Sequence, residues 1–379
     1  MEEKSLQDSY YEQTVITKAQ KRKKILLLLV GLLGFNIFVW GTLYLALSNN
    51  KTNTANPGNI VSSKINATPT PFPFAEITIP YLRSRTYKSS LGELSQVSTN
   101  SEYTSYLTSY DSDGFKVNGL LTIPTGEEAS GGWPAIILVH GYIPPQNYQT
   151  LTSYAQYVDY LARRGFVVFK IDLRGHGNSQ GEPGGSYYSS DYIIDVLNAK
   201  AALASSKDPT NRSGRFVEPN RIGLWGHSMA GNVVVRALAA RPDIPAVVIF
   251  AGAVYTYSDF SQFRIQDSSY QSPSEDSPAR KRRNEMFEIY GQFDPTSSFW
   301  KQVPMTNYLD EIKGAVSINH AVNDSVVSIE YSRNLKRILD STDIVHELNE
   351  YPSGGHNFEG VAFNQAMQNS VEFFDKYLK

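Results

Sequence analysis

From residue 135 onward, short apolar segments alternate with longer helix-like stretches, and this alternation constrains the fold more than any other feature of the sequence. The predicted strands are residues 135–139, 167–171, 222–225, 247–250, 316–318 and 345–348. The predicted helices are residues 151–164, 191–205, 231–240, 328–339 and 361–377. Buried strands separated by helices are typical of a mainly parallel sheet with helices on both faces. We therefore predict an α/β fold of this kind.

A β-hairpin is predicted directly before the alternating part. Two strand-like runs, residues 103–110 and 115–123, flank the turn sequence DSDG at 111–114. Asp and Gly between two such runs are a hairpin signal. In a parallel sheet the reacting groups collect in the loops after the carboxyl ends of the strands, so the loops of residues 135–379 are where chemistry is expected.

An apolar run without any charge covers residues 25–47, and the basic sequence KRKK stands directly before it. As a helix the run would span roughly 35 Å at about 1.5 Å per residue, which is enough for a bilayer core. The positive-inside rule places the N-terminus in the cytoplasm and the rest of the chain outside. A cleaved signal peptide is the alternative, because Ala46-Leu47-Ser48 resembles a cleavage site. The length of the run favours an uncleaved single-pass transmembrane helix.

Four parts of the chain follow from this pattern. Residues 1–24 are a cytoplasmic tail, and residues 25–47 are the transmembrane helix. Residues 48–75 are rich in Asn, Thr, Ser and Pro, a composition typical of a linker. Residues 76–379 are predicted to form one catalytic domain.

Composition excludes several classes of chemistry. The net charge of −2 argues against a general nucleic-acid binder, which would carry a large basic excess. The absence of cysteine excludes disulfides, thiolate nucleophiles and cysteine-based zinc sites. We expect no metal and no cofactor.

The strongest chemical signal is the sequence GHSMAG at 226–231, which follows a predicted strand and opens a predicted helix. A serine in such a sharp strand-to-helix turn has a strained backbone and an exposed hydroxyl, as a nucleophile requires. The backbone N–H of Met229 then faces the developing oxyanion. The usual motif is Gly-x-Ser-x-Gly, whereas here Ala230 holds the fifth position and Gly231 follows it. A helix N-cap is the alternative role for Ser228.

The sequence HGY at 140–142 follows the first central strand. In this type of fold the corresponding loop supplies a second oxyanion donor, which we assign to the backbone N–H of Tyr142. His140 is expected to brace the loop rather than to react.

Asp324 and His356 complete the predicted site. Asp324 follows the strand at 316–318, where a buried carboxylate is placed to orient a histidine, although an N-cap role is the alternative. His356 follows the last strand in the glycine-flanked sequence GGHNF. His346 lies inside a predicted strand, and Asp343 lies in a turn at the opposite edge, so both are weaker candidates. The chain order serine, acid, histidine is the order of this fold.

A long polar insertion separates the predicted strands at 247–250 and 316–318. Residues 255–310 contain five aromatic residues near 287–300 and the basic sequence RKRR at 280–283. We interpret the insertion as a lid. Its aromatic residues would either line a substrate pocket or form the insertion's own small core, and the basic sequence is expected to be a solvated face.

At this point the chain resembles the α/β-hydrolases related to prolyl oligopeptidase and dienelactone hydrolase. The resemblance covers residues 103–378 and rests on SYDSDGFKVNGLLTIP, PAIILVHGY, FKIDLRGHGNSQG, RIGLWGHSMAG, INHAVNDSVV and YPSGGHNF. DLRGHG matches a loop of these enzymes that we expect to act as a local brace. The segment between the apolar run and the first strand is too short for the propeller of prolyl oligopeptidases. Dienelactone hydrolase uses a cysteine nucleophile, which this chain lacks.

The resemblance implies a serine hydrolase with Ser228, Asp324 and His356 as the triad and Tyr142 and Met229 as the oxyanion donors. Ester or peptide bonds would be cleaved through an acyl-enzyme on Ser228. Two alternatives remain open: a cell-surface acyltransferase, and a non-catalytic binding module that keeps the fold.

Overall fold

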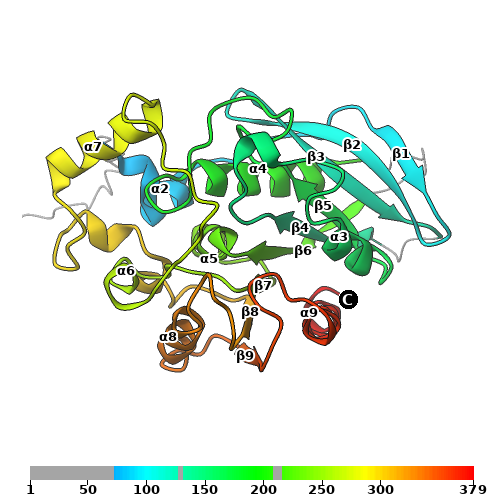
Figure 1. Ribbon diagram of the computed structural model, residues 1–379. Coiled ribbons are helices and arrows are strands. Elements are labelled where there is room, and N and C mark those ends of the chain that lie inside the picture. The colour runs from blue at the N-terminus through cyan, green and yellow to red at the C-terminus, as the bar shows by residue number, and fades with distance from the viewer. Residues whose placement is uncertain (1–71, 127–130, 208–215) are drawn as a thin grey trace, which may run out of the picture. The chain divides into compact units, whose positions relative to one another are not determined.

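One nine-stranded sheet organises the part of the chain that the computed structural model describes, which is residues 72–126, 131–207 and 216–379 (Figure 1). The strand order is β1-β2-β3-β5-β4-β6-β7-β8-β9. Pairing is antiparallel from β1 to β5 across β2 and β3, and parallel from β5 to β9. The strands are β1 Ser95–Thr99, β2 Tyr103–Ser112, β3 Phe115–Pro124, β4 Trp133–Val139, β5 Val167–Ile171, β6 Val217–His227, β7 Ala246–Phe250, β8 Ala315–Ala321 and β9 His346–Tyr351.

Helices cover both faces of the sheet. The α-helices are α2 Ile79–Ser84, α3 Ala155–Ala162, α4 Asp191–Ser205, α5 Met229–Ala240, α6 Asp259–Gln262, α7 Pro278–Tyr290, α8 Glu330–Leu339 and α9 Val361–Leu378. Short 3₁₀ turns lie at Ala75–Ile77, Pro145–Asn147, Trp300–Gln302 and Met305–Asn307. Helices α4, α5 and α8 pack on one face, with α2 against α5, and α3 and α9 pack on the other (Figure 1).

The central strand β4 shows why both faces must be covered. Ile137 and Val139 belong to the core on the α4 and α5 side, while Ile136 and Leu138 belong to the core on the α3 and α9 side. Successive side chains of a strand point to opposite faces, so a strand that is apolar throughout needs a helix layer on each side. The predicted α/β architecture is confirmed.

The predicted elements are present with small changes at their ends. Strand β5 and helix α4 have the predicted bounds, whereas β6 begins earlier because Val217 pairs with Trp133. Strand β1 and helices α2, α6 and α7 were not predicted. The sequence of β1, SQVST, is exposed throughout and has no buried face that would produce an alternating apolar pattern.

The predicted transmembrane helix at 25–47 and most of the predicted linker lie outside the described residues. Within the described residues, no helix combines the length and the apolar character needed to cross a bilayer.

Between β7 and β8, α6, α7 and two 3₁₀ turns form the predicted insertion. Phe299 and Trp300 are buried with Met286 of α7, and Phe74 and Ile77 from the N-terminal side join the same cluster. Tyr290 stacks on Phe299 with ring centroids 3.8 Å apart. The aromatic residues of the insertion therefore form a separate small core.

Candidate active site

Ser228 occupies the turn between β6 and α5 with φ 55° and ψ −120°. A non-glycine residue with positive φ is strained, and such strain persists only where surrounding contacts enforce it. The Ser228 N–H donates to the Phe250 carbonyl at 2.8 Å, and the Ser228 carbonyl accepts from the Gly231 N–H at 2.9 Å. These two bonds hold the turn, and the side chain lines a pocket.

Close backbone contacts explain the glycines around Ser228. A Cβ at Gly226 would lie 2.8 Å from the carbonyl oxygen of Ala230. A Cβ at Gly231 would lie 2.7 Å from the Cα of Gly252. Ala230 is fully buried in the first turn of α5, so the position that must be glycine is 231 rather than 230. The departure from the usual motif is compatible with the turn.

Ser228, His356 and Asp324 lie together, each in the loop after a parallel strand. His356 Nε2 lies 2.9 Å from Ser228 Oγ, and His356 Nδ1 lies 2.8 Å from Asp324 Oδ2. This chain of contacts orients the imidazole so that Nδ1–H donates to the carboxylate and Nε2 can accept the hydroxyl proton.

Asp324 is held by four donors. Its Oδ1 accepts the backbone N–H groups of Val326 and Val327 at 2.8 and 2.9 Å. Its Oδ2 accepts from His356 and also lies 3.2 Å from Nε2 of the fully buried His320. Burial alone would raise the pKa of Asp324, but hydrogen bonds from His320 and His356 outweigh it and hold the pKa well below its usual range. The carboxylate therefore stays ionised beside His356.

His227, the residue before Ser228, was not predicted as part of the site. Its Nε2 lies 2.8 Å from the His356 carbonyl, which can only accept, so Nε2 carries the proton. Its Nδ1 lies 2.5 Å from Tyr154 Oη and accepts from that hydroxyl. Burial, followed by the charge of His356, lowers the pKa of His227 to about 3 and keeps the ring neutral.

Tyr154 links this histidine to the predicted oxyanion loop. Its hydroxyl accepts the Gly141 N–H at 2.9 Å, and the Gly141 carbonyl lies 2.7 Å from His140 Nδ1. His140 is fully buried and lies in the loop-bracing position that we expected. The next backbone N–H, of Tyr142, and that of Met229 have no hydrogen-bond partner in the described part of the chain. The N–H and the carbonyl of Gly141 are thus both held by side chains, next to the free N–H of Tyr142.

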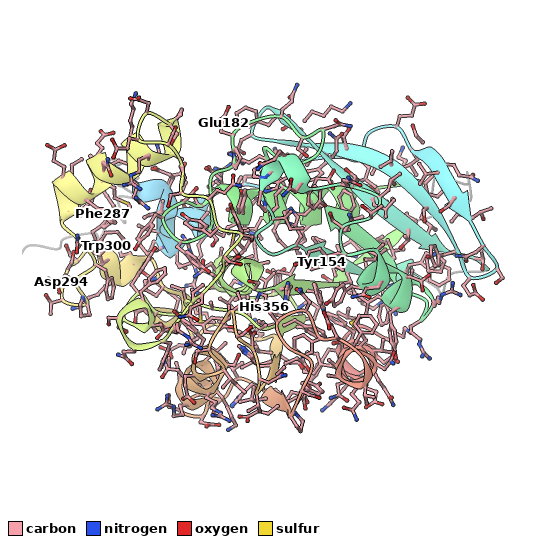
Figure 2. All side chains as sticks on the ribbon, in the orientation of Figure 1. Tyr154, Glu182, Phe287, Asp294, Trp300 and His356 are labelled. Carbon is pink, nitrogen blue, oxygen red and sulfur yellow. The ribbon has the colours of Figure 1, made fainter. Side chains whose placement is uncertain are left out.

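A pocket of about 690 Å³ opens beside Ser228 and His356. Three tyrosines line it, namely Tyr142, Tyr154 and Tyr157, and the insertion contributes only Asp267 and Ser269. None of the insertion's aromatic residues lines this pocket, and Figure 2 shows Phe287 and Trp300 together beside α7, apart from His356. The interpretation that these rings line a substrate pocket is therefore not supported, because the rings pack against one another in the insertion's own core.

The loop DLRGHG acts as the brace that we expected. The Arg174 guanidinium donates to Asp195 of α4 at 2.7 Å, and Ser112 of β2 donates to the same carboxylate at 2.6 Å. Both Arg174 and Asp195 are buried. This pair joins the hairpin, the loop after β5 and α4.

Sequence comparison matches residues 134–270 to the family model "Serine aminopeptidase, S33". The chain is 25% identical to the "Uncharacterized peptidase YuxL" of Bacillus subtilis over 65% of this chain and 34% of that protein. It is 29% identical to the "Quorum-quenching protein AidA" of Acinetobacter baumannii over 37% of this chain and 41% of that protein. The matched region thus spans less than half the length of these curated relatives.

Comparison of the structures finds acetyl xylan esterase 1 from Thermoanaerobacterium, with a TM-score of 0.52, 21% identity, and coverage of 80% of this chain and 95% of that one. Dipeptidyl peptidase 4 from Porphyromonas gingivalis gives a TM-score of 0.52 at 19% identity over 73% of this chain and 36% of that one. At these identities the likeness shows the fold. The chain therefore has the α/β-hydrolase fold and resembles the hydrolases, both esterases and peptidases, that share it.

Proposed function

We propose that this chain is a membrane-anchored serine hydrolase that cleaves ester or peptide bonds through an acyl-enzyme on Ser228. The observation that carries the proposal is the hydrogen-bonded series Ser228–His356–Asp324, in which the serine occupies a strained turn. The anchor rests on the apolar run at residues 25–47 and the KRKK sequence before it, which would place the hydrolase domain outside the cytoplasm.

The proposed reaction has two steps. His356 Nε2 takes the proton of Ser228 as Oγ attacks the carbonyl carbon, and the carbonyl oxygen becomes an oxyanion. The free N–H groups of Tyr142 and Met229 stabilise this charge. His356 then protonates the leaving group. In the second step His356 takes a proton from water as the water attacks the acyl-enzyme, and it returns a proton to Ser228 Oγ as the acyl group leaves. Asp324 stabilises the imidazolium in both steps.

Pre-steady-state kinetics test this proposal. We expect the full-length chain in detergent to release p-nitrophenol from p-nitrophenyl butyrate in a burst of about one equivalent, because acylation of an activated ester precedes a slower deacylation. Ser228→Ala is expected to lower kcat by about 10³-fold or more.

The matched control is Ser261→Ala, which removes an exposed serine hydroxyl of the insertion and leaves the pocket unchanged. It is expected to retain both the burst and the steady-state rate. Equal activity in Ser228→Ala and the wild type would contradict the proposal. A parallel panel of short acyl esters and aminoacyl anilides separates esterase from peptidase activity.

A further inference from the structure

Residues 264–271 of the insertion, which we call the strap, connect the loop of Asp324 to the loop of Tyr142. At one end Ile265 forms a bridge with Val327, and the Gln266 N–H donates to the Val326 carbonyl at 2.7 Å. Val326 and Val327 are the residues whose N–H groups hold Asp324. This end of the strap is therefore fixed to the acid loop.

The other end of the strap contacts the oxyanion loop. The Gln271 N–H donates to Tyr142 Oη at 2.9 Å, and the rings of Tyr142 and Tyr270 lie 5.3 Å apart. Gln146 donates to the Gln271 side chain at 3.2 Å. Both ends are attached to loops of the candidate site, so the residues between them have a defined place at the pocket.

Asp267 and Ser269, in the middle of the strap, line the same pocket as Ser228. Ser269 donates its N–H at 2.8 Å and its hydroxyl at 2.6 Å to Asp267 Oδ1. In the described part of the chain Oδ2 has no hydrogen-bond partner and no cation pairs with Asp267, not even Arg264 of the strap. The carboxylate is thus oriented on one oxygen and free on the other.

The rest of the pocket contains no compensating charge. No Lys or Arg is among the described residues that line it, and Asp324 lies behind His356. Tyr142, Tyr154 and Tyr157 all line this space, and a tyrosine ring attracts a nearby cation. A pocket with one free carboxylate, aromatic walls and no basic residue favours a positively charged ligand and disfavours an anionic one.

We propose that Asp267 is a specificity-determining residue that selects esters or amides carrying an organic cation, such as a protonated amine or a quaternary ammonium, close to the scissile carbonyl. This inference rests on the proposed hydrolase function and specifies the substrate class of the same site. The pocket volume of about 690 Å³ suits a small molecule or a short peptide end rather than a folded protein.

Two pairs of substrates that differ in charge test the inference with the full-length chain. In the first pair, acetylcholine carries the cation in its leaving group, and 3,3-dimethylbutyl acetate is its neutral isostere. In the second pair, assayed at pH 6.5, glycine benzyl ester carries the cation in its acyl group, and N-acetylglycine benzyl ester is the neutral counterpart. For each pair the measured quantity is the ratio of kcat/KM for the cationic ester to kcat/KM for the neutral ester.

In at least one pair we expect Asp267→Asn to lower this ratio about tenfold, since the amide keeps the size of the side chain but removes its charge. The value for the neutral ester should stay within about twofold, because Asp267 takes no part in the proton transfers. Asp276→Asn is the matched control: this carboxylate belongs to the same insertion, is 99% exposed and does not line the pocket. It is expected to leave both ratios unchanged.

Unchanged ratios in Asp267→Asn would overturn the inference. The inference would also be overturned if the chain cleaved none of the four esters while Ser228 still reacted with a fluorophosphonate. That result would support Ser228 as a nucleophile but contradict the proposed substrate class. A chain that neither reacts with the probe nor cleaves the neutral esters would instead overturn the proposed function.

Discussion

At the scale of single residues, two buried histidines support the candidate site without titrating near neutral pH. His227 joins Tyr154 to the backbone of His356, and His140 contacts the carbonyl of Gly141. Burial is the main cause that lowers the pKa of each ring to about 3. Both rings must stay neutral in the folded chain, which makes the stability of the site dependent on pH.

The sign of this dependence follows from proton linkage. In the unfolded chain a histidine binds a proton below about pH 6.5, whereas the folded chain excludes it down to about pH 3. Stability therefore falls as pH falls through 6.5, by about 1.4 kcal/mol per pH unit for each such ring. His227→Gln keeps a donor and an acceptor but does not titrate.

We expect the free energy of unfolding to drop between pH 6.5 and pH 5 by about 2 kcal/mol less in His227→Gln than in the wild type. Urea unfolding of the full-length chain, followed by tryptophan fluorescence at both pH values, measures this difference. The same drop in both proteins would show that His227 takes up its proton in the folded state.

At the scale of elements, the turn from β6 to α5 depends on close backbone contacts. The N-terminus of α5 passes Gly252, which follows β7, so closely that a Cβ at Gly231 would overlap a backbone atom. Backbone cannot move aside as a flexible side chain can. The position of Ser228 therefore depends on Gly231 more than on the residue at 230.

Gly231→Ala is expected to destabilise the chain by about 1–3 kcal/mol, because the added methyl group overpacks a rigid contact. Ala230→Gly is the matched reciprocal change in the same helical turn. It should cost about 1.5 kcal/mol, from lost helix propensity and a lost buried methyl group. Urea midpoints compare the two variants, and a larger loss in Ala230→Gly would show that position 230 is the critical one.

The strands, the helices and the loops that carry Ser228, Asp324 and His356 could be predicted because apolar periodicity and chain order are local signals. The roles of Tyr154 and His320 could not, since each depends on a contact made only in the folded chain. His320 stands four positions before Asp324, but nothing in that spacing shows that both histidines share one carboxylate. Asp267 gave no signal either, because its place depends on both ends of the strap.

At the scale of the whole described molecule, the insertion is attached at two places. Its strap belongs to the candidate site, while its aromatic core packs against Phe74 and Ile77 near the start of the described residues. Arg282 of α7 pairs with Glu76 and lies over the ring of Phe74. Arg282 of the basic sequence at 280–283 thus has a structural partner, although its side chain is still 52% exposed. The two attachments of the insertion have separate roles.

This separation predicts that Trp300→Ala reduces stability more than catalysis. Trp300 is fully buried in the aromatic core and does not line the pocket, so we expect a loss of about 3–5 kcal/mol with KM for a neutral ester changed less than about threefold. Ile289→Ala, at a side chain of α7 that is 48% exposed, is the control and should change neither quantity appreciably. A large rise in KM without loss of stability would show instead that Trp300 contributes to substrate binding.

The central claim, that Ser228 is an activated nucleophile, is tested most directly by fluorophosphonate labelling of the full-length chain followed by peptide mass mapping. The series Ser228–His356–Asp324 predicts about one equivalent of label on Ser228 and no label in Ser228→Ala. Circular dichroism checks that both proteins are folded. Absence of label in the folded wild type, or label on another serine, would contradict the account.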